Sequence, residues 1–254
     1  MRSSDRDAVI DRAFRLLDAF TPTRVELTLD ELAQASGLPR STAHRLAQQL
    51  AERGALERSR RGWRLGVRLF ELGQLVAHPQ RLRDLALAHM EDLYELTHAT
   101  VQLAVLDGIE VLYVEILSGH RKVRTPSRRG GRMPVHCTAL GKALLAFSDD
   151  GGVAILAAAA PLAARTPRTI TDPGRLTAEL HEVRRTGVAF DREEASPGLT
   201  CVAAPVLSAR GVARAALSVS MAAGEGHAPA EIAAAVRVAA LALTRELRAH
   251  PLAV

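Results

Sequence analysis

The chain of 254 residues has only two cysteines, Cys137 and Cys201. This number excludes a disulfide framework, and it also excludes a zinc site built from four cysteines. No apolar run approaches the roughly 18 residues that cross a bilayer. The first residues show no secretory hydrophobic region. We therefore expect a cytoplasmic protein with no membrane partner.

The length predicts two domains, because a typical domain holds roughly 100–200 residues. Charged residues make up 24% of the chain, which is close to the value of about 25% in ordinary globular proteins. No segment is of low enough complexity to indicate wholesale disorder.

Positive charge is concentrated in one short segment. The net charge is +5, and only two of the 33 basic residues are lysines. Residues 40–68 contain eight arginines and two glutamates, a local excess of six that exceeds the net charge of the whole chain. A basic cluster on one small module favours a polyanionic partner, most often nucleic acid. The alternative is a solvated surface, and charge alone does not decide between the two.

The segment before this basic cluster, together with the first part of the cluster, carries the residues that are typical of the starts and ends of three helices. Apolar residues recur at helical spacing over 9–20. Thr28 and Glu31 have the spacing of a capping box at the start of a second helix. Gly37 suits a left-handed turn, and Pro39 suits the first position of a third helix. Two short helices joined by a glycine-containing turn are typical of a helix-turn-helix.

The third helix has an apolar face and a polar face. The residues expected to pack inward are Ala43, Leu46, Ala47 and Leu50. The candidate DNA-binding residues are Arg40, Ser41, Thr42, His44, Arg45 and Gln48. Arginine can donate two hydrogen bonds to guanine, glutamine can pair with adenine, and hydroxyls can bind phosphate. The alternative is an ordinary amphipathic surface helix.

A short basic hairpin follows the third helix. Residues 54–58 and 63–65 are strand-like, and the turn between them carries Arg60 and Arg61. This arrangement predicts a wing whose arginines contact the DNA backbone or the minor groove. An ordinary hairpin is the alternative, but the capping box, glycine turn, polar helix face and basic hairpin occur together in the order of a winged helix-turn-helix. We therefore predict binding to double-stranded DNA.

Residues 66–76 predict a connecting helix, which we expect His78-Pro79 to end. Its apolar residues exceed what a free linker needs, so it packs either against a second copy or against the first helix. The predicted boundaries are 1–65 for the DNA-binding domain, 66–78 for the linker helix and 79–254 for the second domain.

The second domain combines strand pairs with helices. Strands are predicted over 100–106 and 109–116, joined by Asp107-Gly108, and over 200–207 and 212–221. Further helices are predicted over 138–147, 149–159, 175–186 and 229–249. Adjacent hairpin strands surrounded by helices indicate an antiparallel α+β domain.

Five separated segments carry a family resemblance. They are Gly37–Leu46, Trp63–Gly66, His136–Ala146, Asp191–Glu194 and Cys201–Val206. In these segments and in this order, the chain resembles the IclR family of transcriptional regulators. The resemblance implies an N-terminal winged helix-turn-helix and a C-terminal GAF-like effector domain. It also implies a homodimer or a dimer of dimers that controls operons for the catabolism of small organic acids or aromatic compounds.

The resemblance also implies an effector pocket against the antiparallel sheet. The residues it places there are Ala139, Leu140, Asp191, Leu199, Cys201, Ser218 and Ser220. Leu199 and Cys201 share strand parity, as do Ser218 and Ser220, so each pair points to one sheet face. A helix N-terminus favours an anion, whereas Asp191 would repel one unless it is protonated. On the residues alone, Ser218 and Ser220 are surface strand residues.

We predict a sequence-specific regulator, acting as a repressor, whose affinity for its operator changes when a small organic-acid or aromatic effector binds. A metal sensor is one alternative, because His136, Cys137, Asp191 and Cys201 can ligate metal, although their spacing is not that of a metal site. A cysteine-dependent enzyme is another. His136 and Cys137, as neighbours on a strand, would point to opposite faces, and no G-x-S-x-G, G-x-G-x-x-G or P-loop is present. We expect no catalysis, no bound metal and no cofactor.

Overall fold

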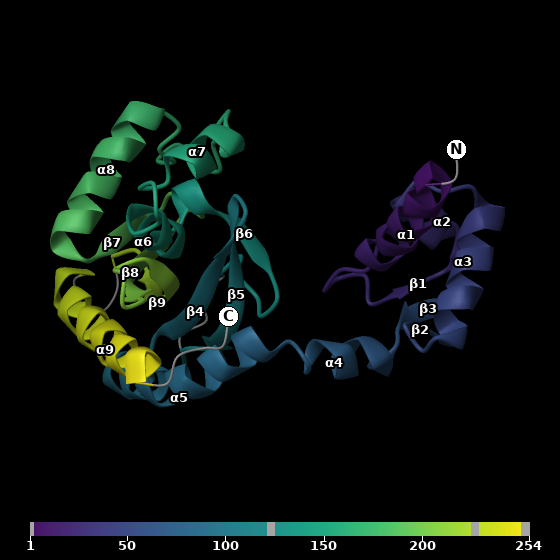
Figure 1. Ribbon diagram of the computed structural model, residues 1–254, viewed down its shortest axis with the longest axis horizontal. Coiled ribbons are helices and arrows are strands. Elements are labelled where there is room, and N and C mark those ends of the chain that lie inside the picture. The colour runs from purple at the N-terminus through teal and green to yellow at the C-terminus, as the bar shows by residue number, and fades with distance from the viewer. Residues whose placement is uncertain (1–2, 121–124, 225–228, 250–254) are drawn as a thin grey trace. The chain divides into compact units, whose positions relative to one another are not determined.

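The computed structural model describes residues 3–120, 125–224 and 229–249. It divides into two compact units, Met1–Ala77 and His78–Val254, called here the N-terminal and C-terminal units (Figure 1). Each unit has its own hydrophobic core. None of the helices within the described ranges combines the length and the apolarity that a membrane span requires.

The N-terminal unit is a small helical domain with a three-stranded antiparallel sheet. Its elements are α1 (Ser3–Asp18), β1 (Glu26–Leu27), α2 (Leu29–Ser36), α3 (Arg40–Glu52), β2 (Leu56–Arg58), β3 (Trp63–Leu65) and α4 (Val67–Gly73). The strand order is β1-β3-β2. The sequence did not predict β1, because a two-residue strand shows no periodicity. Its pairing with β3 joins the predicted hairpin to the segment before α2.

The residues at the ends of α2 and α3 adopt largely the conformations that the sequence predicted. The Thr28 hydroxyl accepts a hydrogen bond from the Glu31 N–H, and the Glu31 carboxylate accepts one from the Thr28 N–H at 2.7 Å, so the capping box is confirmed. Gly37 is left-handed, with a φ of 63°. Pro39 lies one position earlier than predicted. It is the N-cap residue in an extended conformation, and its carbonyl accepts the first helical hydrogen bond from Ala43.

The connection between the units differs from the prediction. The linker helix α4 ends at Gly73, and residues 74–76 separate it from α5 (Ala77–Thr97). His78 and Pro79 lie in the first turn of α5, so the prediction that they end a helix was wrong. Proline is tolerated in a first turn because its missing N–H would have no partner there.

The C-terminal unit is built on a six-stranded antiparallel sheet with the order β6-β5-β4-β9-β8-β7. The strands are β4 (Thr100–Asp107), β5 (Glu110–Leu117), β6 (Arg132–Pro134), β7 (Ala189–Arg192), β8 (Leu199–Leu207) and β9 (Ala213–Ala222). The helices, besides α5, are α6 (Ala139–Ala146), α7 (Val153–Ala159), α8 (Pro173–Thr186) and α9 (Pro229–Ala249), with a 3₁₀ turn η1 (Val135–Cys137). The predicted α+β class is confirmed.

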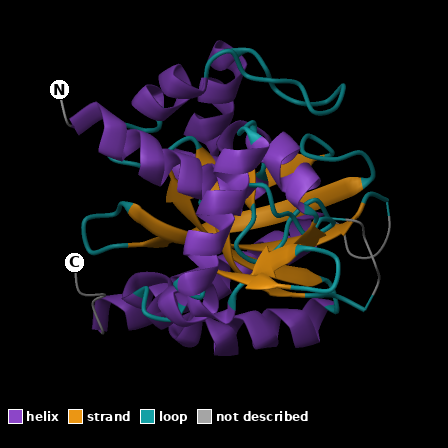
Figure 2. Cartoon of the chain, turned by 90° about the vertical axis from the view of Figure 1, so that its right-hand side faces the viewer, coloured by secondary structure: helices purple, strands orange, loops and turns teal. Residues whose placement is uncertain are grey.

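Helices cover both faces of this sheet (Figures 1 and 2). On one face, α5 and α9 pack against residues such as Val202, Leu217 and Val219. On the other face, α6 packs against β8 and β9, and α8 packs on α6. Strand residues alternate between the two faces. Ser218 and Ser220 therefore point to the α6 side, where the candidate site lies.

Candidate functional site

The polar face of α3 is solvent-accessible. Ala43, Leu46 and Ala47 are buried in the core of the N-terminal unit. On the other face Arg40, Ser41, Arg45 and Gln48 are exposed, while Thr42 and His44 are half-buried. Four of the six predicted residues of α3 are therefore exposed, and the other two, Thr42 and His44, are partly accessible.

Two of these arginines differ in how they are held. The Arg40 guanidinium forms an ion pair with Asp30 of α2. Arg45 makes a long contact of 3.5 Å to Gln49, one turn further along α3. Since this contact is at the limit of a hydrogen bond, Arg45 is available to a partner that approaches the helix.

The wing is a tight turn with two exposed arginines. Arg60 and Arg61 lie at its tip, and the Ser59 N–H donates to the Gly62 carbonyl at 2.9 Å. A Cβ at Gly62 would lie 2.2 Å from the Leu27 carbonyl oxygen, so only glycine allows the turn to approach β1 this closely. Trp63 is buried beneath the wing, with the Arg58 guanidinium 3.9 Å from its ring centroid. The contacts of Gly62 and Trp63 therefore fix the position of the turn that carries Arg60 and Arg61.

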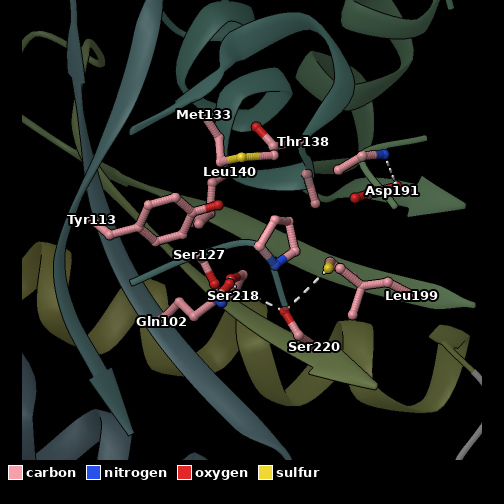
Figure 3. A pocket seen from close by; sticks show the side chains of 14 residues that line it. Gln102, Tyr113, Ser127, Met133, Thr138, Leu140, Asp191, Leu199, Ser218 and Ser220 are labelled. Carbon is pink, nitrogen blue, oxygen red and sulfur yellow. Dashed lines mark hydrogen bonds between the residues drawn. The ribbon is translucent and has the colours of Figure 1, made fainter. Parts of the chain in front are cut away.

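The C-terminal unit contains a cavity between the start of α6 and the sheet (Figure 3), called here the effector cavity after the pocket that the family resemblance implies. All seven residues implied by the family resemblance line it: Ala139, Leu140, Asp191, Leu199, Cys201, Ser218 and Ser220. The lining also includes Thr138, at the helix start that the family resemblance implies closes the pocket, and it includes Gln102, Tyr113, Pro126, Ser127, Met133 and Ala195, which the sequence did not single out. Among these, Gln102 gave a signal that could have been used, since it is an amide side chain between Val101 and Leu103 in the apolar middle of its strand.

Gln102 joins the hydroxyl groups of the cavity into one network. Its Oε1 accepts hydrogen bonds from the Ser218 and Ser220 hydroxyls, each at 3.1 Å (Figure 3). Its Nε2 donates to the Ser127 hydroxyl at 2.6 Å, and the Cys201 thiol lies 3.1 Å from the Ser220 oxygen. Ser218 and Ser220 are 0% and 1% exposed. The interpretation of these serines as surface residues is therefore wrong, because they belong to the cavity wall.

Asp191 is a buried carboxylate with one unused oxygen. Its Oδ1 accepts hydrogen bonds from the N–H groups of Glu194 at 2.7 Å and Ala195 at 3.3 Å. Its Oδ2 has no hydrogen-bond partner within the described part of the chain. Burial raises the pKa of Asp191 to about 6. The cavity therefore offers an acceptor that a donor on a ligand could satisfy.

The start of α6 faces the same cavity. Thr138 is the N-cap residue, and its hydroxyl accepts from the Gly141 N–H at 3.0 Å. Helix geometry leaves the N–H groups of Ala139 and Leu140 without an intrahelical partner. Gly141 allows the helix to begin against η1, because a Cβ there would lie 2.1 Å from the Val135 carbonyl oxygen. Such a helix start favours an anionic group.

Comparison with known proteins identifies the two units. Residues 9–60 match the model of the IclR helix-turn-helix domain, and residues 74–245 match that of the bacterial transcriptional regulator IclR C-terminal region. The chain belongs to the IclR family. The resemblance predicted from the sequence is confirmed, and this IclR-family regulator has a helix-turn-helix DNA-binding domain and a C-terminal effector-binding domain.

Individual relatives agree with this assignment. The HTH-type transcriptional regulator XynR of Escherichia coli is 33% identical over 213 residues, which cover 83% of this chain and 84% of XynR. The transcriptional repressor IclR of Escherichia coli is 31% identical, with 83% and 78% covered. An IclR homologue from Microbacterium hydrocarbonoxydans, solved in complex with 4-hydroxybenzoate, is 34% identical and superposes with a TM-score of 0.86, with 95% and 99% covered.

In this IclR-family protein, Cys137 and His136 are not placed as a nucleophile and its base. Both lie in η1, so their placement on a strand was wrong; a single 3₁₀ turn takes the place of the strand between β6 and α6. The His136 Nε2 lies 3.0 Å from the Ala163 carbonyl, and the Cys137 thiol donates to the Pro134 carbonyl at 3.8 Å. Burial raises the pKa of Cys137 to about 12, and burial followed by the Asp191 charge raises the pKa of Cys201. Both thiols are therefore protonated near neutral pH.

The metal-sensor alternative finds no support in the described residues. Within residues 3–120, 125–224 and 229–249, no three histidine, cysteine or acidic side chains are grouped so that they could hold a metal ion. The chemistry that the cavity offers is hydrogen bonding, with Asp191 Oδ2 as an acceptor and the start of α6 as a donor.

Proposed function

We propose that this protein is a repressor whose affinity for a near-palindromic operator changes when a small organic acid binds in the effector cavity. The observation that carries the DNA-binding part is the exposed polar face of α3, whose opposite face is buried in the core. In a helix-turn-helix, the second helix lies in the major groove, with its side chains on base edges. Arg40, Ser41, Thr42, His44, Arg45 and Gln48 are the proposed DNA contacts of α3, and Arg60 and Arg61 are those of the wing.

The effector we propose carries a carboxylate and a hydrogen-bond donor at its other end. The N–H groups at the start of α6 would receive the carboxylate, and Asp191 Oδ2 would accept from the donor. This arrangement separates the anionic end of the effector from the Asp191 charge. The compound bound by the Microbacterium relative, 4-hydroxybenzoate, has both groups. The cavity binds and does not catalyse, because neither thiol is activated.

A homodimer or a dimer of dimers fits the apolar surface of the N-terminal unit. Phe70 of α4 is 67% exposed, and Leu75, just after it, is 77% exposed. Exposed apolar residues gathered on a short helix and just after it are typical of a protein interface. Two winged units joined in this way would read two half-sites of one operator.

Replacing Arg45 by alanine should weaken operator binding by about 1–3 kcal/mol, because a bidentate contact to guanine contributes that much discrimination. Band shifts with the operator and with an unrelated duplex of equal length, at one salt concentration, would measure the change. Affinity for the unrelated duplex should change much less. Arg175→Ala removes the same charge from an exposed position of the C-terminal unit and is the matched control. Unchanged operator affinity in Arg45→Ala would contradict the assignment.

Replacing Arg60 or Arg61 by alanine should weaken binding to all DNA sequences alike. Each phosphate contact that is lost lowers the slope of log K against log salt by about 0.9. Titrations of the operator and of the unrelated duplex between low and moderate salt would measure this slope. A slope equal to that of the unaltered protein would show that the wing does not contact phosphate.

A further inference from the structure

The effector cavity is too small for the ligands proposed above. Its open volume is about 20 Å³, room for about one water molecule, whereas a cavity that admits benzene has about 150 Å³. A protein interior is packed closely, so space for an organic acid appears only if part of the wall moves.

Most of the wall belongs to the sheet or to the start of α6, and these lining residues are buried in the core of the C-terminal unit. Pro126 and Ser127 differ. They lie in the segment 125–131 between β5 and β6, where Pro126 is exposed and Ser127 is half-buried. This segment, called here the β5–β6 segment, is therefore the part of the wall with the least burial to lose.

Backbone hydrogen bonds to Tyr113 hold the C-terminal end of the segment, at Gly130 and Gly131, and a side-chain hydrogen bond to Gln102 holds its cavity-facing part, at Ser127. The two Ser–Gln102 bonds described above saturate Oε1, so only the amide nitrogen of Gln102 remains to hold another group. That nitrogen carries two N–H groups, and the Ser127 hydroxyl accepts from one of them at 2.6 Å. An acceptor group of a ligand that enters the cavity on the side of the β5–β6 segment would compete with the Ser127 hydroxyl for this N–H.

The same segment is also connected to α5 through a buried carboxylate. A register shift between Leu103 and Ala104 places Glu115 opposite Leu103, which packs on the α5 side of the sheet. Glu115 is 1% exposed, and its two oxygens bind Arg129 of the β5–β6 segment and Arg83 of α5. A buried carboxylate that loses one of its two arginines is costly to keep, so the remaining partner is forced to adjust.

Helix α5 is the element through which such an adjustment would leave the effector cavity. It begins at Ala77, where the chain passes from one unit to the other, and Arg83 lies in its second turn. Contacts around the β5–β6 segment thus connect the cavity wall to the start of the helix that follows the linker.

We propose that the β5–β6 segment is a displaceable wall of the effector cavity, held by Ser127 on Gln102, and that its release moves Arg129 away from Glu115 and loosens Arg83 and the start of α5. This proposal rests on the proposed function of the cavity as the effector site. It assigns Gln102 and Ser127 to control of access and Glu115 to transmission.

Hydrogen–deuterium exchange of the full chain without effector tests the proposal. Ser127→Ala removes the hydroxyl that holds Gln102. It should speed exchange of the Gly130 N–H, which is bonded to the Tyr113 carbonyl at 2.8 Å, by about five- to tenfold, the change expected when one hydrogen bond is lost. Amides 82–86 of α5 should exchange faster by a smaller factor. Ser148→Ala, which removes a hydroxyl remote from the cavity lining, is the control and should change neither region.

Arg129→Ala tests the connection from Glu115 to α5 separately from the hydrogen bond between Ser127 and Gln102. It leaves Ser127 on Gln102, so it should speed exchange in α5 at least as much as Ser127→Ala does. Unchanged exchange of the Gly130 N–H in Ser127→Ala would overturn the displaceable wall, and unchanged exchange of α5 in both variants would overturn the transmission. Because no effector is added, neither result depends on the effector class, and a failure of organic acids to bind would count only against the proposed function.

Discussion

Replacing Lys142 by methionine is expected to destabilise the C-terminal unit by about 3–5 kcal/mol, the cost of leaving one partner of a buried ion pair alone. Lys142 is 0% exposed, and its Nζ lies 2.7 Å from Glu194 and 3.2 Å from Glu179. Glu194 is also buried, and its second oxygen has no partner among the described residues. Without the ammonium group, the Glu194 charge would be almost uncompensated.

Urea unfolding with two probes would measure this effect. Trp63, the one tryptophan of the chain, is buried in the N-terminal unit, so its fluorescence reports that unit, whereas circular dichroism reports the helices of both. Lys142→Met should shift the dichroism transition and leave the fluorescence transition in place. The double variant Lys142→Met with Glu194→Gln removes both charges and should recover most of the stability. A single variant that loses less than about 1 kcal/mol would contradict the role of the pair.

Replacing Asp191 by asparagine is expected to stabilise the protein at pH 7.5 while removing its response to the effector. The folded state raises the pKa of Asp191 to about 6, whereas an unfolded aspartate titrates at about 3.9. The folded state therefore binds the proton more tightly, so stability from this group is fully present below about pH 4 and is lost as the pH rises through about 6. Above that range the buried charge costs up to about 3 kcal/mol.

Asparagine has no charge to bury, and its amide oxygen can still accept from Glu194 and Ala195. Asp191→Asn should therefore raise the free energy of unfolding by about 1–3 kcal/mol at pH 7.5, with a gain that shrinks below about pH 5. Calorimetry with 4-hydroxybenzoate as the probe should show that binding is lost, because the NH2 group that takes the place of Oδ2 donates hydrogen bonds and cannot accept one from the ligand. Asp92→Asn, at an exposed position of α5, is the control. A variant that is less stable at pH 7.5 would show that the Asp191 charge supports the fold instead of the ligand.

Local signals predicted the N-terminal unit because its fold depends on neighbours in the sequence. The capping box of Thr28 and Glu31, the left-handed Gly37 and the alternation of α3 each need only a few residues of context. The short strands β1, β6 and β7 could not be predicted, since they form only by pairing with distant strands. The start of α5 at Ala77 was missed because proline is permitted in a first helical turn.

In the effector cavity too, some residues could be predicted from the sequence, whereas others depend on contacts between distant segments. The family resemblance implied seven of its residues, and strand parity placed Ser218 and Ser220 on one face. Gln102 was missed because its role depends on the pairing of β4 with β9, which sets it opposite Ser218. Ser127 was missed because a segment between strands has no periodicity. The size of the cavity depends on packing and could not be predicted from any pattern.

The proposed regulation depends on the polar face of α3 contacting bases in a DNA groove. The most direct measurement is a competition between genomic fragments, including the DNA upstream of the protein's own gene, and random duplex of equal length at physiological salt. We expect at least one fragment to bind at least about a thousandfold more tightly than random DNA, and we expect Arg45→Ala to reduce that preference. Equal binding to every fragment and to random DNA, with and without organic acids, would contradict it.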